Sequence, residues 1–388
     1  MTVLKSSRFQ DTAYSAEWRA LTACVFPHAK LWYLDDPLRC RLNWSALIAQ
    51  AQRHAMLPLL IVRLQQLAVS ISPEIQTYLR SWERSQTIFT LTLTAELFLI
   101  LERLANLDVG VLVTKGPALS VRCYGDVRMR QYGDLDLIVR DKDIKSIVEE
   151  MVKLGYESRL SLSAIHAAKS PGEYVVTNKD KRVHVEFHTE KTLRYNPKPL
   201  RIDGLFDRRS TVAIDGHKIP ALSTEDELVL LCVHGAKHFW ERLMWISDVA
   251  ALICSQAPDW GRTAAIANEF GAERMLLLGL LLASDVLGAE LPLDIEAMVR
   301  ADRVVGKLGV QIQSQLACQE PQALGILQRA AFRFKSAGSL LQGLAYLLRL
   351  TLSPTEEDWT EGNQSRPALL EAIGRPLRLA RKYGHFRN

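Results

Sequence analysis

Two short apolar runs, each joined to charged residues, constrain this chain more than any other feature. Val111 to Val113 leads into Lys115-Gly116, which predicts a buried strand entering a tight turn. Asp134-Leu-Asp136-Leu-Ile-Val139 predicts a second strand about twenty residues later. Because side chains alternate across a strand, Asp134 and Asp136 are expected on the same face. Two neighbouring carboxylates repel each other, and a divalent cation such as Mg²⁺ relieves that repulsion.

A third carboxylate lies on a later predicted strand, Arg182 to His188. There His184, Glu186 and His188 fall on one face and the intervening apolar residues on the other. If this strand lies beside the aspartate strand, Glu186 completes a three-carboxylate site for one or two metal ions, which suits in-line phosphoryl displacement. The same strand permits a zinc hypothesis with both histidines as ligands. The alternative is that these polar residues are solvated and have no catalytic or metal-binding function.

These motifs resemble those of the DNA polymerase beta-type nucleotidyltransferase superfamily, in particular its branch of uncharacterised nucleotidyltransferases. The resemblance covers roughly Trp44 to Ile253. It implies a nucleotidyltransferase-like fold and an enzyme that transfers a nucleoside monophosphate, most simply AMP from ATP with Mg²⁺ or Mn²⁺, to a hydroxyl or similar acceptor. The segments that carry the resemblance are Lys115-Gly-Pro-Ala-Leu119, Arg128 or Arg130, Gly133-Asp-Leu-Asp-Leu137, His184-Val-Glu-Phe-His188 and a later stretch from Glu225 to Asp248.

The cationic residues around these motifs are candidates for binding phosphate. The wider superfamily usually has Gly-Ser at the first turn, whereas this chain has Lys115-Gly116. Phosphate contacts are therefore expected from Lys115 or from backbone amides, because a lysine at such a turn can bind a β- or γ-phosphate. Either Arg128 or Arg130 can clamp a phosphate, and the resemblance favours Arg128. A plain surface charge is the alternative for each of them.

A second group of candidates follows Ser223-Thr-Glu-Asp226, a capping box that predicts a helix start. On one continuous helix, five residues would share a stripe. The functional hypothesis makes the stripe a wall of the site, with Trp245 stacking on a base and a histidine or carboxylate acting as general base. The alternative is a buried His-Asp network that pins the helix to the sheet. A break near Gly235 or Arg242 would scatter the stripe, which consists of His234, His238, Glu241, Trp245 and Asp248.

The hydrophobic patterns predict an α+β fold in three segments. Residues 1–108 form an N-terminal helical lobe, 109–220 a nucleotidyltransferase-like mixed β-sheet core, and 221–388 a C-terminal helical lobe. The sheet is expected to have four or five strands with helices on one side, and the last lobe four to six helices up to Leu352. Further predicted elements are helices from Trp44 to Leu57, Leu59 to Leu67, Pro73 to Ala105 and Lys142 to Leu154, and a hairpin that pairs Glu173 to Thr177 with the strand beginning near Val183.

The composition of the chain limits the classes of partner that it is expected to bind. A net charge of +5 over 388 residues permits an anionic ligand but argues mildly against long nucleic acids as acceptors, although the tail from Arg375 is basic. Six scattered cysteines without a Cys-x-x-Cys pair, and no apolar leader or span, predict a cytoplasmic protein that does not cross a membrane. The expected partners are an NTP and an acceptor that is a small molecule, a peptide or a protein. A non-catalytic NTP-binding scaffold is the alternative to the enzyme.

Overall fold

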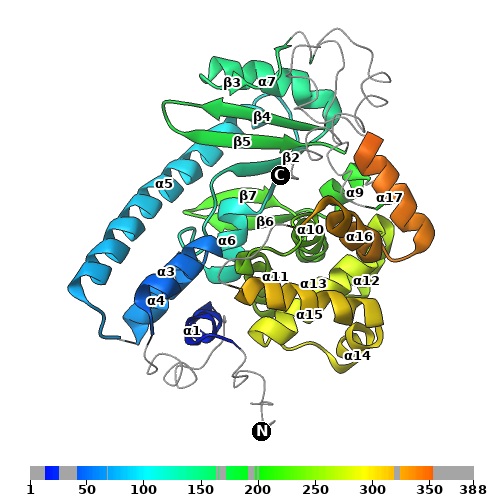
Figure 1. Cartoon of the computed structure of the whole chain (residues 1–388). Helices are drawn as coiled ribbons and strands as arrows, with labels where there is room; N and C mark the ends of the chain where they lie inside the picture. The colour runs from blue at the N-terminus through cyan, green and yellow to red at the C-terminus, as the bar shows by residue number, and fades with distance from the viewer. Residues whose placement is uncertain are drawn as a thin grey trace, which may run out of the picture.

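A computed structural model of the chain shows a mixed β-sheet flanked by helices (Figure 1). The expectations for the polar segment 354–367 and for the basic tail lie outside the residues that the structure describes. These described residues are 14–25, 42–67, 69–162, 165, 172–190, 197–198, 201–318 and 324–352.

The sheet has seven strands among the described residues, in the order β3-β4-β5-β2-β1-β7-β6. The prediction of four or five strands was therefore too low, because the short β3 and the β6–β7 hairpin extend the sheet at its two edges. β2 pairs antiparallel with β1 and parallel with β5. The β4–β5 hairpin forms as predicted. The strands are β1 (Val111–Thr114), β2 (Leu135–Val139), β3 (Glu157–Ser158), β4 (Glu173–Asn178), β5 (Val183–His188), β6 (Ser210–Ile214) and β7 (His217–Ala221).

Alternation along the strands divides the apolar side chains between two hydrophobic clusters, one on each face of the sheet. Leu135, Leu137 and Val139 of β2 belong to the cluster that contains α5 (Pro73–Ala105) and α7 (Ile144–Lys153). Ile138 belongs to the other cluster, with Leu119 of α6 (Gly116–Tyr124) and most of the C-terminal helices. Helices therefore cover both faces, and the expectation of helices on one side was wrong. We call the second face the α6 face.

The N-terminal helices largely follow the predicted boundaries. Asn43 caps α3 through a side-chain bond from the Ala46 N–H, and α5 has the predicted limits, with Ser72 as its N-cap. The predicted crossover helix is shorter, because a 3₁₀ turn occupies Asp141–Asp143 before α7. The remaining helices of this half are α1 (Ala16–Val25), α3 (Trp44–Arg53), α4 (Leu57–Gln66) and α9 (Ile202–Asp207).

The described C-terminal part contains eight helices up to Leu352, more than the four to six predicted. Ser223 caps the first of them by accepting the Asp226 N–H, as the capping box predicted. The expected single helix through Asp248 is broken, because α10 ends at Lys237 and α11 begins only at Leu243. These helices are α10 (Thr224–Lys237), α11 (Leu243–Gln256), α12 (Trp260–Phe270), α13 (Glu273–Leu287), α14 (Leu293–Ala301), α15 (Arg303–Ala317), α16 (Ile326–Ser336) and α17 (Leu340–Leu352).

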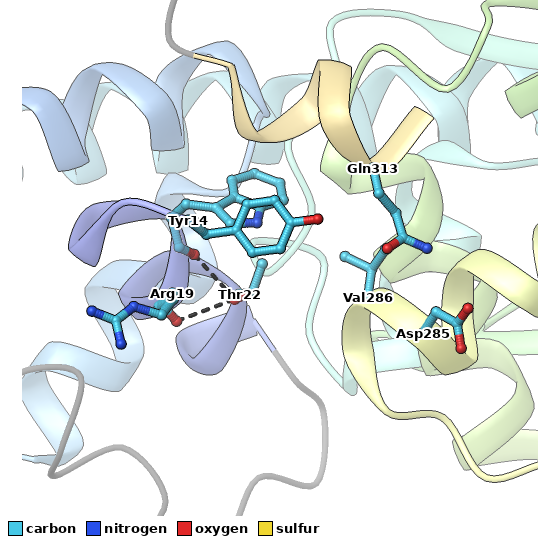
Figure 2. Close-up of a pocket in the computed structure, with 7 residues that line it drawn as sticks. Tyr14, Arg19, Thr22, Asp285, Val286 and Gln313 are labelled. Atoms are coloured by element: carbon cyan, nitrogen blue, oxygen red, sulfur yellow. Dashed lines mark hydrogen bonds between the residues drawn. The ribbon is translucent and has the colours of Figure 1, made fainter. Parts of the chain in front are cut away.

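The hydrophobic cluster on the α6 face joins the N-terminal helices to the C-terminal helices. Leu21 of α1 and Leu47 of α3 share this cluster with Leu278 of α13. A cavity of about 50 Å³ lies between α1, α13 and α15, lined by residues that include Tyr14, Thr22, Asp285 and Gln313 (Figure 2). Its volume suits a few water molecules at most. No helix among the described residues is long and apolar enough to span a bilayer.

Candidate active site

The candidate site lies on the α6 face, where three strands bring polar side chains into one row. Asp136 pairs with Thr114 across the β1–β2 ladder and with Glu186 across the parallel β2–β5 ladder. Because residues in register on neighbouring strands project from the same face, the two carboxylates are adjacent, as predicted. His188, two residues after Glu186, contacts both, with its Nε2 atom 2.7 Å from Asp136 Oδ1 and 3.7 Å from Glu186 Oε2.

Asp136, Glu186 and His188 each offer one atom to a common point. These three atoms lie within 4.8 Å of one another, and Asp136 is buried. Two carboxylate oxygens and one imidazole nitrogen form a donor set that fits Mg²⁺ or, because of the nitrogen, Mn²⁺. The set differs from the predicted one, since His188 takes part and Asp134 does not belong to this three-residue group.

Charge in the site is dominated by carboxylates held out of water. Burial and the neighbouring Asp136 charge raise the pKa of Glu186 to about 7. Burial and Asp136 likewise raise the pKa of Asp134. Asp136 itself stays ionised, because Lys115 and His188 hold its pKa well below the usual range against the effect of burial. The site therefore carries negative charge that a divalent cation would neutralise.

Asp134 lies just before β2 rather than in it, so the predicted strand began one residue too early. It is half-buried, the charge of Asp136 raises its pKa, and its own charge helps to raise the pKa of Glu186. The turn after β1 lies beside it, since a Cβ atom added to Gly116 would be 3.9 Å from the Asp134 carbonyl oxygen. The predicted proximity of the glycine turn to the aspartates is therefore present in the structure.

Lys115 connects the turn to the carboxylates. Its Nζ atom lies 3.3 Å from Asp136 Oδ2, and its backbone has φ 54° and ψ −141°, a conformation that is strained for any residue with a Cβ atom. Glu227 of α10 holds this backbone, because its Oε1 atom accepts hydrogen bonds from the Lys115 N–H and the Thr114 hydroxyl. Sequence reasoning missed Glu227, although an acidic residue that follows the capping box in the first turn of an apolar helix was an available signal.

The two candidate arginines already have carboxylate partners. Arg128 is exposed and makes an ion pair with Asp126 at 2.6 Å. Arg130 is buried, and its Nε atom donates to both oxygens of Asp248 of α11, at 3.0 and 3.1 Å. The Tyr124 hydroxyl bonds the same carboxylate. Arg130 and Asp248 therefore tie the loop before β2 to α11, and the predicted histidine partner of Asp248 is replaced by an arginine.

The α10–α11 connection still brings three of the five stripe residues together. The imidazole of His234 lies 4.6 Å from that of His238 and 5.5 Å from the Trp245 ring, centroid to centroid. Trp245 is only 8% exposed. Glu241 is exposed, and Asp248 bonds Arg130 instead. We call His234, His238 and Trp245 the histidine cluster.

The zinc hypothesis required both histidines of β5 at one ion. His184 is exposed, and its Nδ1 atom lies 3.0 Å from the Thr177 hydroxyl oxygen. Among the described residues, the group that could hold an ion includes His188 but not His184. The geometry therefore favours the carboxylate-rich site.

The sheet order and the row of carboxylates beside a lysine-bearing turn define an α+β fold of the nucleotidyltransferase type. A sequence model of the family described as uncharacterised nucleotidyltransferases matches residues 41–288, and the chain belongs to that family. The resemblance predicted from the motifs is thereby confirmed, and it extends further along the chain than Ile253. No curated protein matches the chain. The matched segment ends just after α13, so α14 to α17 lie beyond it.

Proposed function

We propose that this protein is a metal-dependent nucleotidyltransferase that transfers a nucleoside monophosphate, most simply AMP from ATP, to an acceptor hydroxyl. The observation that carries the proposal is the register of Asp136 with Glu186, which places two carboxylates and His188 around one point. A Mg²⁺ or Mn²⁺ ion there would neutralise triphosphate charge and make the acceptor oxygen more acidic. Asp134 supplies further negative charge at the edge of the site.

The chain supplies the remaining groups for the reaction. The acceptor oxygen forms a bond to the α-phosphorus, the bond from this phosphorus to the bridging oxygen breaks, and pyrophosphate leaves. Lys115, beside the Gly116 turn and the N-terminus of α6, stabilises negative charge on the phosphate oxygens. Arg128, on the surface beside Asp126, can turn toward a phosphate, whereas Arg130 acts by holding the loop against α11.

Two groups can take the acceptor proton. Glu186 can do so where Asp136 and His188 hold the ion without it, because burial first of all raises the pKa of its carboxyl, free of metal, to about 7, which suits a general base near neutral pH. His234 is kept neutral, because burial and the Lys115 charge lower its pKa, and it interacts electrostatically with Asp136. A His234→Gln variant distinguishes them, because it leaves the three donor residues Asp136, Glu186 and His188 in place and changes the pH–rate profile of transfer only if His234 is the base.

The central test is transfer of label from α-³²P-ATP in the presence of Mn²⁺ and a cell extract as the source of acceptor. We expect Asp136→Asn to reduce transfer by roughly 10²–10³-fold. Asp180→Asn is the matched control, because Asp180 is exposed in the β4–β5 turn of the same sheet. Transfer that survives Asp136→Asn would contradict the metal assignment.

A second candidate is an NTP-binding protein without transferase activity. It is favoured by the internal contacts of Asp136, whose two oxygens already meet Lys115 and His188. This alternative predicts that ATP binds with Mn²⁺ but that no label is transferred to any component of the extract. Equilibrium binding of ATP, measured beside the transfer assay, separates the two functions.

A further inference from the structure

The turn between α10 and α11 is strained and rigidly held. Phe239 and Trp240 are consecutive non-glycine residues with φ of 57° and 54°. This backbone conformation is unfavourable for a residue with a Cβ atom and persists only where its surroundings fix it. Here they do, because the fully buried Trp240 ring lies on two glycines. A Cβ atom on Gly235 would be 2.5 Å from Trp240 Cζ3, and one on Gly279 would be 3.1 Å from its Cη2 atom.

The strained turn determines which side chains surround His238. It places the His238 ring 5.1 Å from Trp245 and 4.6 Å from His234. Arg242, the last residue of the turn, has its guanidinium 6.0 Å from the Trp245 ring centroid. Arg333 of α16 approaches from another element, 5.1 Å above the Phe239 ring. Strain that assembles polar and cationic side chains in this way is characteristic of functional sites.

Positive charge dominates around this group. Burial lowers the pKa of His238 to about 3, and the charges of four basic residues act in the same direction. Burial and neighbouring basic residues also lower the pKa of His234, and the charge of Asp136 acts in the opposite direction. The imidazoles therefore stay neutral near pH 7, when each can donate one N–H. The four basic residues are Lys237, Lys115, Arg242 and Arg333.

We propose that His234, His238, Lys237, Arg242 and Arg333 bind a phosphate group on the acceptor substrate. The proposal rests on the proposed function, because it assigns the acceptor class of that reaction. Imidazole N–H groups and guanidinium ions are strong donors to such anions. The histidine cluster adjoins the candidate site formed by Asp136, Glu186 and His188, which we call the strand site, since His234 interacts electrostatically with both Lys115 and Asp136.

The same charges could serve the triphosphate of ATP instead, so the test must separate the two anions. Inorganic phosphate is titrated calorimetrically into the full chain in EDTA, which removes metal-dependent binding from the measurement. In parallel, ATP is titrated in the presence of Mn²⁺. We expect Arg242→Gln to weaken phosphate binding about tenfold or more, the loss typical of a charge-assisted hydrogen bond, and to leave ATP–Mn²⁺ binding within about twofold.

Asp136→Asn should give the reverse pattern, with ATP–Mn²⁺ binding lost and phosphate binding retained. Arg303→Gln is the matched control, because Arg303 is exposed on α15 and the substitution changes the net charge equally. Arg242→Lys, which keeps the charge, should recover part of the phosphate affinity. Thermal unfolding of each variant excludes loss of the fold as the cause.

The transfer assay gives a third readout, with glycerol and glycerol 3-phosphate as a matched pair of acceptors. The proposal predicts preference for the phosphorylated acceptor in the wild type and loss of this preference in Arg242→Gln. Equal weakening of phosphate and ATP by Arg242→Gln, or no phosphate binding to the wild type, would overturn it. If the wild type binds phosphate but neither binds nor uses ATP, the proposed function fails, and the acceptor role is lost with it.

Discussion

The strand site and the histidine cluster are neighbouring regions with opposite electrostatics. At Asp136 and Glu186, buried carboxylates stand in register on two strands, and the pKa of Glu186 rises to about 7. At His238, burial and nearby basic residues lower the pKa to about 3. Burial disfavours the charged form in both places, but the excess fixed charge is negative in one region and positive in the other. The first region is therefore suited to a cation and the second to an anion.

Lys115 and the Arg130–Asp248 pair connect the two regions. Lys115 meets Asp136 directly and also acts on both imidazoles of the histidine cluster. The buried pair fixes the loop that precedes β2 against α11, which carries Trp245. A triphosphate bound at the first region and an anionic acceptor bound at the second would thus contact two parts of the chain that these residues hold together.

The largest effect is expected from breaking the connection. Asp248→Ala leaves the Arg130 guanidinium buried without its partner and should lower the free energy of unfolding by about 3–5 kcal/mol in urea denaturation. Asp126→Ala is the matched control, because it breaks an exposed pair with Arg128 and should cost under about 1 kcal/mol. Similar losses in the two variants would mean that Arg130 and Asp248 contribute no more than a surface pair.

The next largest effect belongs to the negative region. Asp136→Asn removes one negative charge at the centre of the donor set and should reduce nucleotidyl transfer by roughly 10²–10³-fold. Mn²⁺ binding, followed by electron paramagnetic resonance, should weaken in parallel, whereas Asp180→Asn should bind Mn²⁺ like the wild type. Unchanged Mn²⁺ affinity in Asp136→Asn would remove the distinction between the two regions.

A smaller effect is expected from the turn that builds the positive region. Gly235→Ala places a methyl group against the Trp240 ring and should destabilise the protein by about 1–3 kcal/mol, as overpacking does. It should also weaken phosphate binding without changing Mn²⁺ affinity. The control is Gly306→Ala on α15, where an added Cβ has no neighbour within 4 Å. Phosphate affinity that is insensitive to Gly235→Ala would show that the strained turn does not shape the anion site.

The smallest effect is the pH dependence of the positive region. His238 stays neutral in the folded chain until the pH nears 3, whereas in the unfolded chain it takes up a proton near pH 6.5. Its contribution to stability is therefore complete above pH 6.5 and is lost as the pH falls toward 3. Because His238 is only partly buried, we expect its share of the loss between pH 7 and pH 5 to be about 1 kcal/mol.

The measurement compares urea unfolding of the wild type with that of His238→Gln at the two pH values. The variant should lose less stability on acidification than the wild type does. His184→Gln is the control, since it makes the same substitution at a histidine that is exposed on β5. An equal pH dependence in wild type and His238→Gln would argue that His238 is not held neutral.

Local patterns predicted the sheet side of the site well. Period-two alternation predicted that Glu186 and His188 share one face of their strand, because that alternation is a property of every strand. That this strand lies beside Asp136 was a condition of the prediction, and the β2–β5 pairing meets it. No local pattern ranked His188 above Asp134 as a donor, since that choice depends on the parallel register of β2 and β5. The helical stripe failed for a different reason. The spacing of its residues fits a continuous helix. In the structure α10 ends at Lys237, and the turn that follows is held by the contacts of the buried Trp240 with two glycines.

The amino-acid sequence by itself determined the classes of element, the Lys115-Gly116 turn, the acidic pair and the family, because these follow from spacing and side-chain chemistry along short stretches. Which residues of the site contact each other was decided only by the tertiary structure. It paired Arg130 with Asp248, set Glu227 under the Lys115 backbone, and gathered basic residues from several elements around His238. The first two contacts join residues more than a hundred positions apart along the chain, and Lys115 and Arg333 are likewise distant in sequence from His238. No local pattern fixes such pairings, which form only where packing excludes water and unpaired charge is costly.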